Sequence, residues 1–135
     1  MRICNVCKKK KKDHKILKDY SDKSGIEFLS TGFTLESIDL LAKIGLKRWK
    51  VPSGEINNIP LLRKIATKNQ PIIISSGMAT MGEVEFALKV LCENNLEKEK
   101  ISVLHCNTAY PTPMEDVNLK AITTIKNSFN VNAGY

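Results

Sequence analysis

The hydrophobic residues of this 135-residue chain follow two spacings in turn. Short apolar runs of the kind found in buried strands are each followed by a stretch with apolar residues at helical spacing. The predicted strands cover residues 26–31, 48–53, 71–76, 101–106 and 131–135. The predicted helices cover residues 35–44, 59–68, 81–93 and 116–129, and an amphipathic stretch over residues 13–23 precedes the first strand. This alternation predicts parallel strands joined by helical crossovers.

Two architectures contain such an alternation, an open doubly wound sheet and a (β/α)₈ barrel. An open dinucleotide-binding sheet usually carries a G-x-G-x-x-G turn after its first strand, and this sequence has none there. Polar residues instead follow the predicted strands, where a barrel places its active site. A complete barrel takes about 250 residues. The sequence therefore predicts an α/β fold of the (β/α)₈ TIM-barrel type, of which only a part is present.

The formal net charge of +7 is concentrated at the N-terminus. Residues 1–18 hold eight basic side chains and one acidic one, so the remaining 117 residues carry 13 of each sign. This distribution excludes the broad basic face of a nucleic-acid-binding domain. We interpret residues 1–12, with the run Lys8–Lys12, as a disordered basic leader ahead of a barrel segment over residues 13–135. A tail for nucleic acid or an anionic membrane is the alternative.

No stretch of the sequence approaches the ~20 apolar residues of a membrane span. The basic N-terminus also lacks the apolar core of a secretory signal. The four cysteines are scattered in a chain large enough to bury a core, so we expect reduced thiols in a cytoplasmic protein. Cys4 and Cys7 form a C-x-x-C pair, which we interpret as part of an unstructured leader. The alternatives are half of a zinc site or a redox motif.

The residues at the strand ends indicate which chemistry they serve. One ammonium and three hydroxyls, which fit the oxygens of a phosphate or carboxylate, come from Lys50, Thr31, Ser53 and Ser75. If the strands lie side by side, these groups converge. Glu55 follows a strand end and is placed to exchange a proton with a bound molecule, or alternatively to cap the next helix.

Two further residues follow the predicted strand 101–106 or lie within it. His105 is interpreted as a core histidine, with a role in a site as the alternative. Strand alternation would place His105 and Asn107 on one face and Cys106 and Thr108 on the other. Tyr110 begins the Tyr-Pro-Thr-Pro loop, whose prolines restrict the backbone. The two alternatives are that this loop holds the Tyr110 hydroxyl over a ligand or that it serves only to close the connection.

Several of these residues belong to longer motifs. They are Lys50–Ile56 (KVPSGEI), Ile74–Thr80 (ISSGMAT), Leu104–Pro113 (LHCNTAYPTP) and Glu115–Leu119 (EDVNL). Together, and in this order, they resemble the barrel domain of the sialic acid synthase family, which includes N-acetylneuraminate and legionaminate synthases. The resemblance runs from about Asp13 to Tyr135.

The resemblance implies condensation of phosphoenolpyruvate with an N-acetylated hexose, N-acetylmannosamine or a diacetamido-dideoxy relative. The product would be a nine-carbon 2-keto sugar acid, with release of phosphate. The implied phosphoenolpyruvate contacts are Thr31, Lys50, Ser53, Ser75 and Thr108. Glu55 matches the acidic residue linked to proton handling and Tyr110 a sugar-side position. The resemblance also implies a homodimer and a divalent metal, Mn or Mg, that activates the sugar aldehyde.

The sequence departs from the family pattern in ways that affect the expected activity. Some members have the phosphoenolpyruvate-contacting Asn at the position of Thr108, whereas this chain has Asn107. The family's first two strands, and the Ser-Asp-His motif and later His that hold the metal, have no counterpart here, so no metal ligand is expected in this chain. We therefore expect strands three to seven of a synthase barrel, inactive alone. The alternative is an inactive barrel piece that acts only as a binding or interaction module, or a relic.

Overall fold

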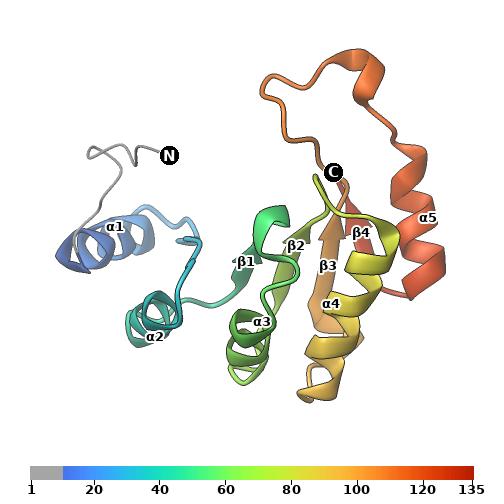
Figure 1. The fold of residues 1–135 in the computed structure, drawn as a ribbon. Helices are drawn as coiled ribbons and strands as arrows, with labels where there is room; N and C mark the ends of the chain where they lie inside the picture. The colour runs from blue at the N-terminus through green and yellow to red at the C-terminus, as the bar shows by residue number, and fades with distance from the viewer. Residues whose placement is uncertain (1–10) are drawn as a thin grey trace.

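The computed structural model describes residues 11–135, which contain four parallel strands and five helices longer than one turn (Figure 1). The helices are α1 (Lys11–Lys23), α2 (Leu35–Lys43), α3 (Ile59–Ala66), α4 (Met81–Glu93) and α5 (Lys120–Phe129). The strands are β1 (Trp49–Val51), β2 (Ile72–Ser75), β3 (Ile101–Leu104) and β4 (Asn132–Gly134). Short 3₁₀ turns cover Ser53–Glu55, Lys98–Lys100 and Met114–Asp116.

The strands are parallel and adjacent in chain order, β1-β2-β3-β4. A doubly wound sheet reverses its strand order at a switch point, and the described sheet has no such reversal. Helix α2 packs on α3, and α3 packs on α4, so successive crossovers lie side by side. This strand order, with its helical crossovers side by side, matches the order in the wall of a (β/α)₈ barrel.

Alternate residues of the strands point to opposite faces of the sheet, and only one face is fully buried. In β2, Ile72 and Ile74 are buried against the helices, whereas Ile73 and Ser75 are half-buried. In β1, Lys50 lies between two buried neighbours and is itself half-buried. Because Lys50 is the ladder partner of Ile73, the side chains of Lys50 and Ser75 share the second face, the interior of a barrel.

Local signals explain where several helices begin. Thr80 accepts a hydrogen bond from the backbone N–H of Glu83, and the Glu83 carboxylate accepts one from the backbone of Thr80, a capping box that starts α4. Thr34 and Ser37 form the same arrangement at α2. These boxes stabilise the first turns of α4 and α2, because each satisfies backbone groups that the first helical turn leaves free.

The predicted strand over residues 26–31 is wrong, because this segment is irregular and pairs with no strand. Gly25, with a φ of 69°, ends α1 in a Schellman motif in which the N–H of Ile26 is bonded to the carbonyl of Ser21 at 3.0 Å. The apolar side chains of Ile26 and Leu29 are 62% and 42% exposed. The apolar run therefore forms no ladder and buries little of its surface.

Other predicted boundaries differ by a few residues. The amphipathic stretch over 13–23 is confirmed as a helix, but α1 begins at Lys11, so residues 11 and 12 of the predicted leader are helical. Helix α5 begins at Lys120 rather than near Asp116, because the extended backbone of Val117 separates it from the preceding 3₁₀ turn. The proposed C-x-x-C pair, Cys4 and Cys7, lies outside the described residues.

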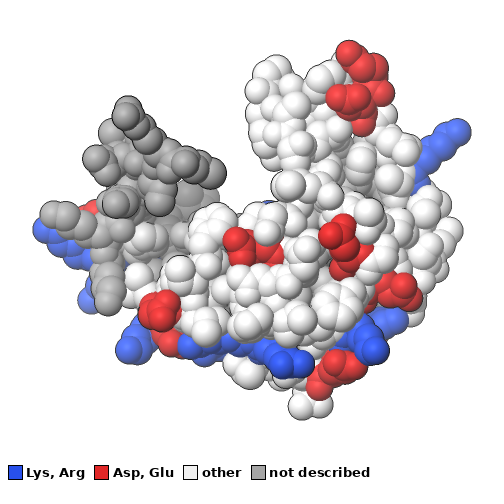
Figure 2. Space-filling view, in the orientation of Figure 1, with Lys and Arg blue, Asp and Glu red and all other residues white. Residues whose placement is uncertain are grey.

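Basic and acidic residues are distributed unevenly over the face drawn in Figure 2. Lys and Arg gather along its lower edge, near the ends of the sheet where the strands begin. Acidic groups lie in the middle of this face and on the raised loop, and much of the remaining upper surface is uncharged. Within residues 11–135, no helix is both long and apolar enough to cross a membrane.

Candidate active site

The carboxyl ends of β1, β2 and β3 surround a pocket of about 260 Å³. Hydrogen bonding between the strands places their ends side by side, so residues about 25 positions apart in sequence become neighbours. The residues that line the pocket are Lys50, Pro52, Ser53, Ser75, Gly77, Cys106, Asn107, Thr108 and Tyr110. Five of the seven site residues predicted from sequence are therefore brought together.

Lys50 is the cation of this pocket. Its Nζ donates a hydrogen bond to Ser75 Oγ and lies 3.4 Å from the backbone oxygen of Val51. Burial lowers the pKa of Lys50 below its ordinary value, and the neighbouring Cys106 thiol opposes this shift. A partly desolvated ammonium gains more from an anionic ligand than a fully hydrated surface lysine does, because less water screens the pair.

Gly77 allows three loops to approach one another above the sheet. A Cβ at this position would lie 3.2 Å from Ser53 Oγ and 3.4 Å from Thr108 Cγ2. By contrast, a Cβ at Gly54 would meet nothing within 4 Å. The absence of a side chain at Gly77 therefore leaves room for Ser53 and Thr108 to lie close to its backbone. Gly77 belongs to the motif Ile74–Thr80, and no role was predicted for it from sequence.

The residues after β3 depart from the predicted alternation at Asn107, which shares the pocket with Cys106 and Thr108. Strand β3 ends at Leu104, and Cys106, Asn107 and Thr108 all line the pocket, because the backbone leaves extended pairing at His105. Cys106 Sγ lies 3.6 Å from Ser75 Oγ. Asn107 Nδ2 donates to the backbone oxygen of Asp116 at 3.1 Å, and Asn107 Oδ1 is buried with no partner among the described residues.

Two predicted site residues are not in the lining. The carboxylate of Glu55 accepts a hydrogen bond from Asn58 Nδ2 at 2.7 Å, and Asn58 in turn caps α3. The cap of α3 is therefore Asn58 rather than Glu55, whose carboxylate holds the capping side chain. Thr31 lies in the irregular segment before α2, which has no ladder to bring it beside β1. A role of either residue in binding or proton transfer stays a prediction.

His105 and Tyr110 occupy different environments. His105 Nε2 accepts a hydrogen bond from the backbone N–H of Asn118 at 3.4 Å, and its ring lies 5.8 Å from that of Tyr135. It therefore holds the loop that follows β3 and does not line the pocket, but its half-buried side chain is not the core histidine that was predicted. Tyr110 lines the pocket and is 84% exposed, so its phenol lies at the rim.

The donor groups of the pocket suit an anion. One ammonium, the hydroxyls of Ser53, Ser75 and Thr108, and no carboxylate line it. They do not fit a divalent metal, which prefers carboxylate, carbonyl or imidazole ligands. Within the described residues, no group of three or more His, Cys, Asp or Glu side chains is placed to hold a metal ion. The donor groups of the pocket thus match the hydrogen-bonding needs of phosphate or carboxylate oxygens.

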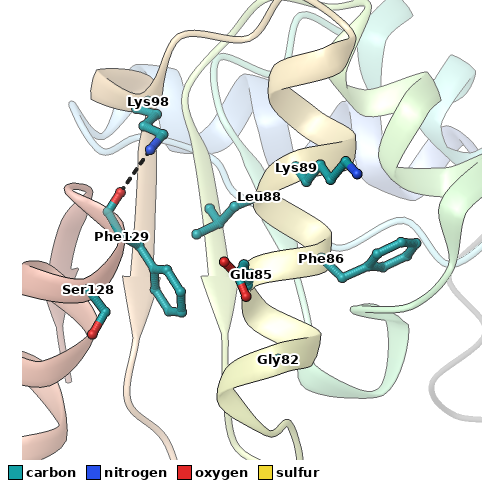
Figure 3. A pocket seen from close by; sticks show the side chains of 8 residues that line it. All are labelled: Gly82, Glu85, Phe86, Leu88, Lys89, Lys98, Ser128 and Phe129. Carbon is teal, nitrogen blue, oxygen red and sulfur yellow. Dashed lines mark hydrogen bonds between the residues drawn. The ribbon is translucent and has the colours of Figure 1, made fainter.

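A larger hollow of about 610 Å³ lies between α4 and α5, on the helical side of the sheet (Figure 3). Phe86, Leu88 and Phe129 supply its apolar surface, and Lys98 Nζ donates to the backbone oxygen of Phe129 at 3.2 Å. Barrels of this type perform their chemistry at the carboxyl ends of the strands rather than between the outer helices. The smaller pocket is therefore the candidate active site.

Comparison with known proteins gives the family. The whole chain, residues 1–135, matches the NeuB family. The chain belongs to the NeuB family. One curated relative, the N,N'-diacetyllegionaminic acid synthase of Campylobacter jejuni, is 52% identical over 92% of this chain and 37% of its own length. The synthase of the same name from Legionella pneumophila is 43% identical over 91% of this chain and 35% of its own length.

Solved structures agree with this membership in the NeuB family. The N-acetylneuraminic acid synthetase of Leptospira borgpetersenii, crystallised in complex with citrate, superposes with a TM-score of 0.87 at 33% identity. The match covers 94% of this chain and 44% of that one. This chain thus spans about a third of the length of the two curated relatives, and its fold is the α/β, TIM-barrel type of the sialic acid synthases.

Proposed function

We propose that the chain is part of a sialic acid synthase barrel that condenses phosphoenolpyruvate with an N-acetylated hexose. The products would be a nine-carbon 2-keto sugar acid and phosphate. The observation that carries this proposal is the pocket at the ends of β1, β2 and β3, where Lys50 and three hydroxyls converge without a carboxylate. Membership of the NeuB family supports the same reaction.

Phosphoenolpyruvate matches the pocket in charge and in hydrogen-bonding type. It carries a phosphate and a carboxylate, and its ionised form can only accept hydrogen bonds. Lys50, Ser53, Ser75 and Thr108 all offer donors, and charge-assisted bonds from such groups are the stronger class. Thr31, which the family resemblance also assigns to phosphoenolpyruvate, would have to approach from the segment before α2.

The amino sugar fits the other edge of the pocket. The buried acceptor Asn107 Oδ1 cannot be satisfied by phosphoenolpyruvate, which has no donor, but a sugar hydroxyl or acetamido N–H would satisfy it. The hydrogen bond from Asn107 Nδ2 to a backbone carbonyl fixes this orientation of the amide. We place the sugar between Asn107 and the rim residue Tyr110, with Glu55 as the proposed proton-handling residue.

The names of the relatives favour one sugar class over another. The two relatives at 52% and 43% identity are named diacetyllegionaminic acid synthases, whereas the Leptospira enzyme at 33% is named an N-acetylneuraminic acid synthetase. We therefore propose a diacetamido-dideoxy hexose as the first substrate to test and N-acetylmannosamine as the second.

Direct binding measurements with the 135-residue chain test the anion site. Isothermal titration with phosphoenolpyruvate should show binding, and Lys50→Met should weaken it at least about tenfold, because the site's only cation is lost. Lys89→Met is the matched control, since Lys89 lies on the exposed side of α4 and is outside this pocket. Equal loss in both variants, or no binding by the wild-type chain, would contradict the proposal.

A second candidate function is a binding module without catalysis. The lack of a metal-holding cluster within residues 11–135 favours it, since polarisation of the aldehyde by a metal can contribute several kcal/mol. Phosphate release from phosphoenolpyruvate, with each sugar and Mn²⁺, separates the two functions. Binding without release supports the binding module, and release at a rate above a Lys50→Met control supports an enzyme.

A further inference from the structure

We propose that Cys106 is a positioning residue that directs the hydroxyl proton of Ser75 toward the bound anion. This inference rests on the anion site proposed above and assigns a function to a thiol that the site chemistry has not yet used. It concerns three side chains from neighbouring strands, Lys50 of β1, Ser75 of β2 and Cys106 just after β3.

The contacts around Ser75 Oγ are the basis of the inference. Oγ accepts a hydrogen bond from Lys50 Nζ and lies 3.6 Å from Cys106 Sγ. An ammonium can only donate, whereas a thiol is a weak donor and a weak acceptor. A hydroxyl has one proton and two lone pairs. When both Lys50 and Cys106 donate to Oγ, the two lone pairs are occupied and the Ser75 proton must point elsewhere.

The direction left for that proton is the pocket. Ser75, Lys50 and Cys106 all line it, together with Ser53 and Thr108 from the two flanking loops. A hydroxyl that is held with its proton toward an anionic oxygen forms a charge-assisted hydrogen bond without first having to rotate. The Cys106 thiol therefore preorganises a donor without itself needing to touch the ligand.

The opposite arrangement of protons makes the opposite prediction. If Ser75 donated its proton to Cys106 Sγ, the hydroxyl would be turned away from the ligand. Removal of the thiol would then free the proton and strengthen anion binding. The two arrangements can thus be distinguished by the sign of the effect of a single substitution.

Phosphoenolpyruvate and inorganic phosphate are the probes, and their dissociation constants are measured with the full chain. Cys106→Ala should weaken binding of both about three- to tenfold, the effect of one hydrogen bond of ordinary strength. Cys106→Ser keeps a donor and should restore affinity to within about twofold of wild type. Cys92→Ala, which removes the half-buried thiol of α4 outside the pocket, is the control and should leave affinity unchanged.

A double-mutant cycle tests whether the effect passes through Ser75. In a Ser75→Ala background, Cys106→Ala should cause no further loss, because there is no hydroxyl left to direct. If Cys106→Ala does not fold, judged by circular dichroism, the pair Cys106→Thr and Cys106→Val replaces it. These two side chains have nearly the same shape and differ in the donor, so Thr should bind the anion more tightly than Val.

The outcomes separate this inference from the proposed function. If wild type binds phosphoenolpyruvate and Lys50→Met does not, the anion site stands. Unchanged or tighter binding by Cys106→Ala, equal loss in Cys106→Ala and Cys106→Ser, or an undiminished loss in the Ser75→Ala background would then overturn the role of Cys106 alone. If the wild-type chain binds neither probe, the proposed function fails first.

Discussion

Two segments with similar sequence patterns have different structures in this chain. Residues 26–31 and residues 71–76 are both short apolar runs that end in hydroxyl residues. The second run forms β2, with Ile72 and Ile74 buried, and delivers Ser75 to the pocket. The first run remains irregular between α1 and α2, with Ile26 largely exposed (Figure 1).

The difference shows that pairing, rather than pattern, brings site residues together. β2 has a partner on each side, so its backbone groups are satisfied in register and its end is fixed beside those of β1 and β3. The segment over residues 26–31 pairs with no described strand, and its first N–H is used by the end of α1. Thr31 and Ser75 therefore occupy similar positions in the pattern but different positions in space.

The largest expected effect follows from this contrast in burial. Ile74→Ala should lower the free energy of unfolding by about 2–5 kcal/mol, because a fully buried side chain leaves a cavity between the sheet and its helices. Ile26→Ala should change it by less than about 0.5 kcal/mol, because Ile26 is 62% exposed. Urea denaturation followed by circular dichroism compares the two. A cost at Ile26 equal to that at Ile74 would show that residues 26–31 are packed like a strand in solution.

The sequence predicted well those elements whose stabilising contacts are local or repeat with a clear period. Helix α4 begins and ends where its spacing placed it, at Met81 and Glu93, because a capping box and a regular apolar face both mark it. Strands β1 to β4 also lie within their predicted ranges, and β2 and β3 are marked by short apolar runs followed by polar residues. The convergence of Lys50, Ser53 and Ser75 followed from parallel order alone.

What the sequence missed depends on contacts between distant residues. Cys106 was interpreted only as a reduced thiol and was placed on the face opposite Asn107, because strand alternation was continued two residues beyond the actual end of β3. The role of Gly77 is visible only once Ser53 and Thr108 are known to flank it. The sequence left two roles open for Glu55, proton transfer and helix capping. Only the structure shows that its carboxylate accepts a hydrogen bond from Asn58.

A second effect concerns the pH dependence of anion binding. Burial lowers the pKa of Lys50, so the free pocket loses its positive charge at a pH below the ordinary lysine value of 10.5. Affinity for phosphoenolpyruvate should therefore fall as pH rises through this lowered pKa, with a slope approaching about tenfold per pH unit. Because arginine stays charged, Lys50→Arg should remove the decline. Titration calorimetry over a pH series measures both.

The Lys50→Arg variant also tests whether one of two other groups of the pocket causes the decline in affinity. Cys106 and Tyr110 also line it, and each would add negative charge near the ligand on losing a proton. If either group caused the decline, Lys50→Arg would retain it, and Cys106→Ser or Tyr110→Phe would remove it instead. The pH series thus shows whether the buried lysine or another group sets the upper limit of binding.

The smallest expected effect returns to the unpaired segment. Ser53→Ala should weaken phosphoenolpyruvate binding about threefold, because it removes one hydroxyl donor from the lining. Thr31→Val, which also removes one hydroxyl, should leave the dissociation constant unchanged, because Thr31 lies outside the pocket in the described structure. Titration calorimetry at one pH is sufficient for both variants. An equal loss in Thr31→Val would mean that the ligand brings residues 26–31 against β1. Residues 26–31 would then pair with the sheet only after the ligand binds, whereas β2 is already paired before binding.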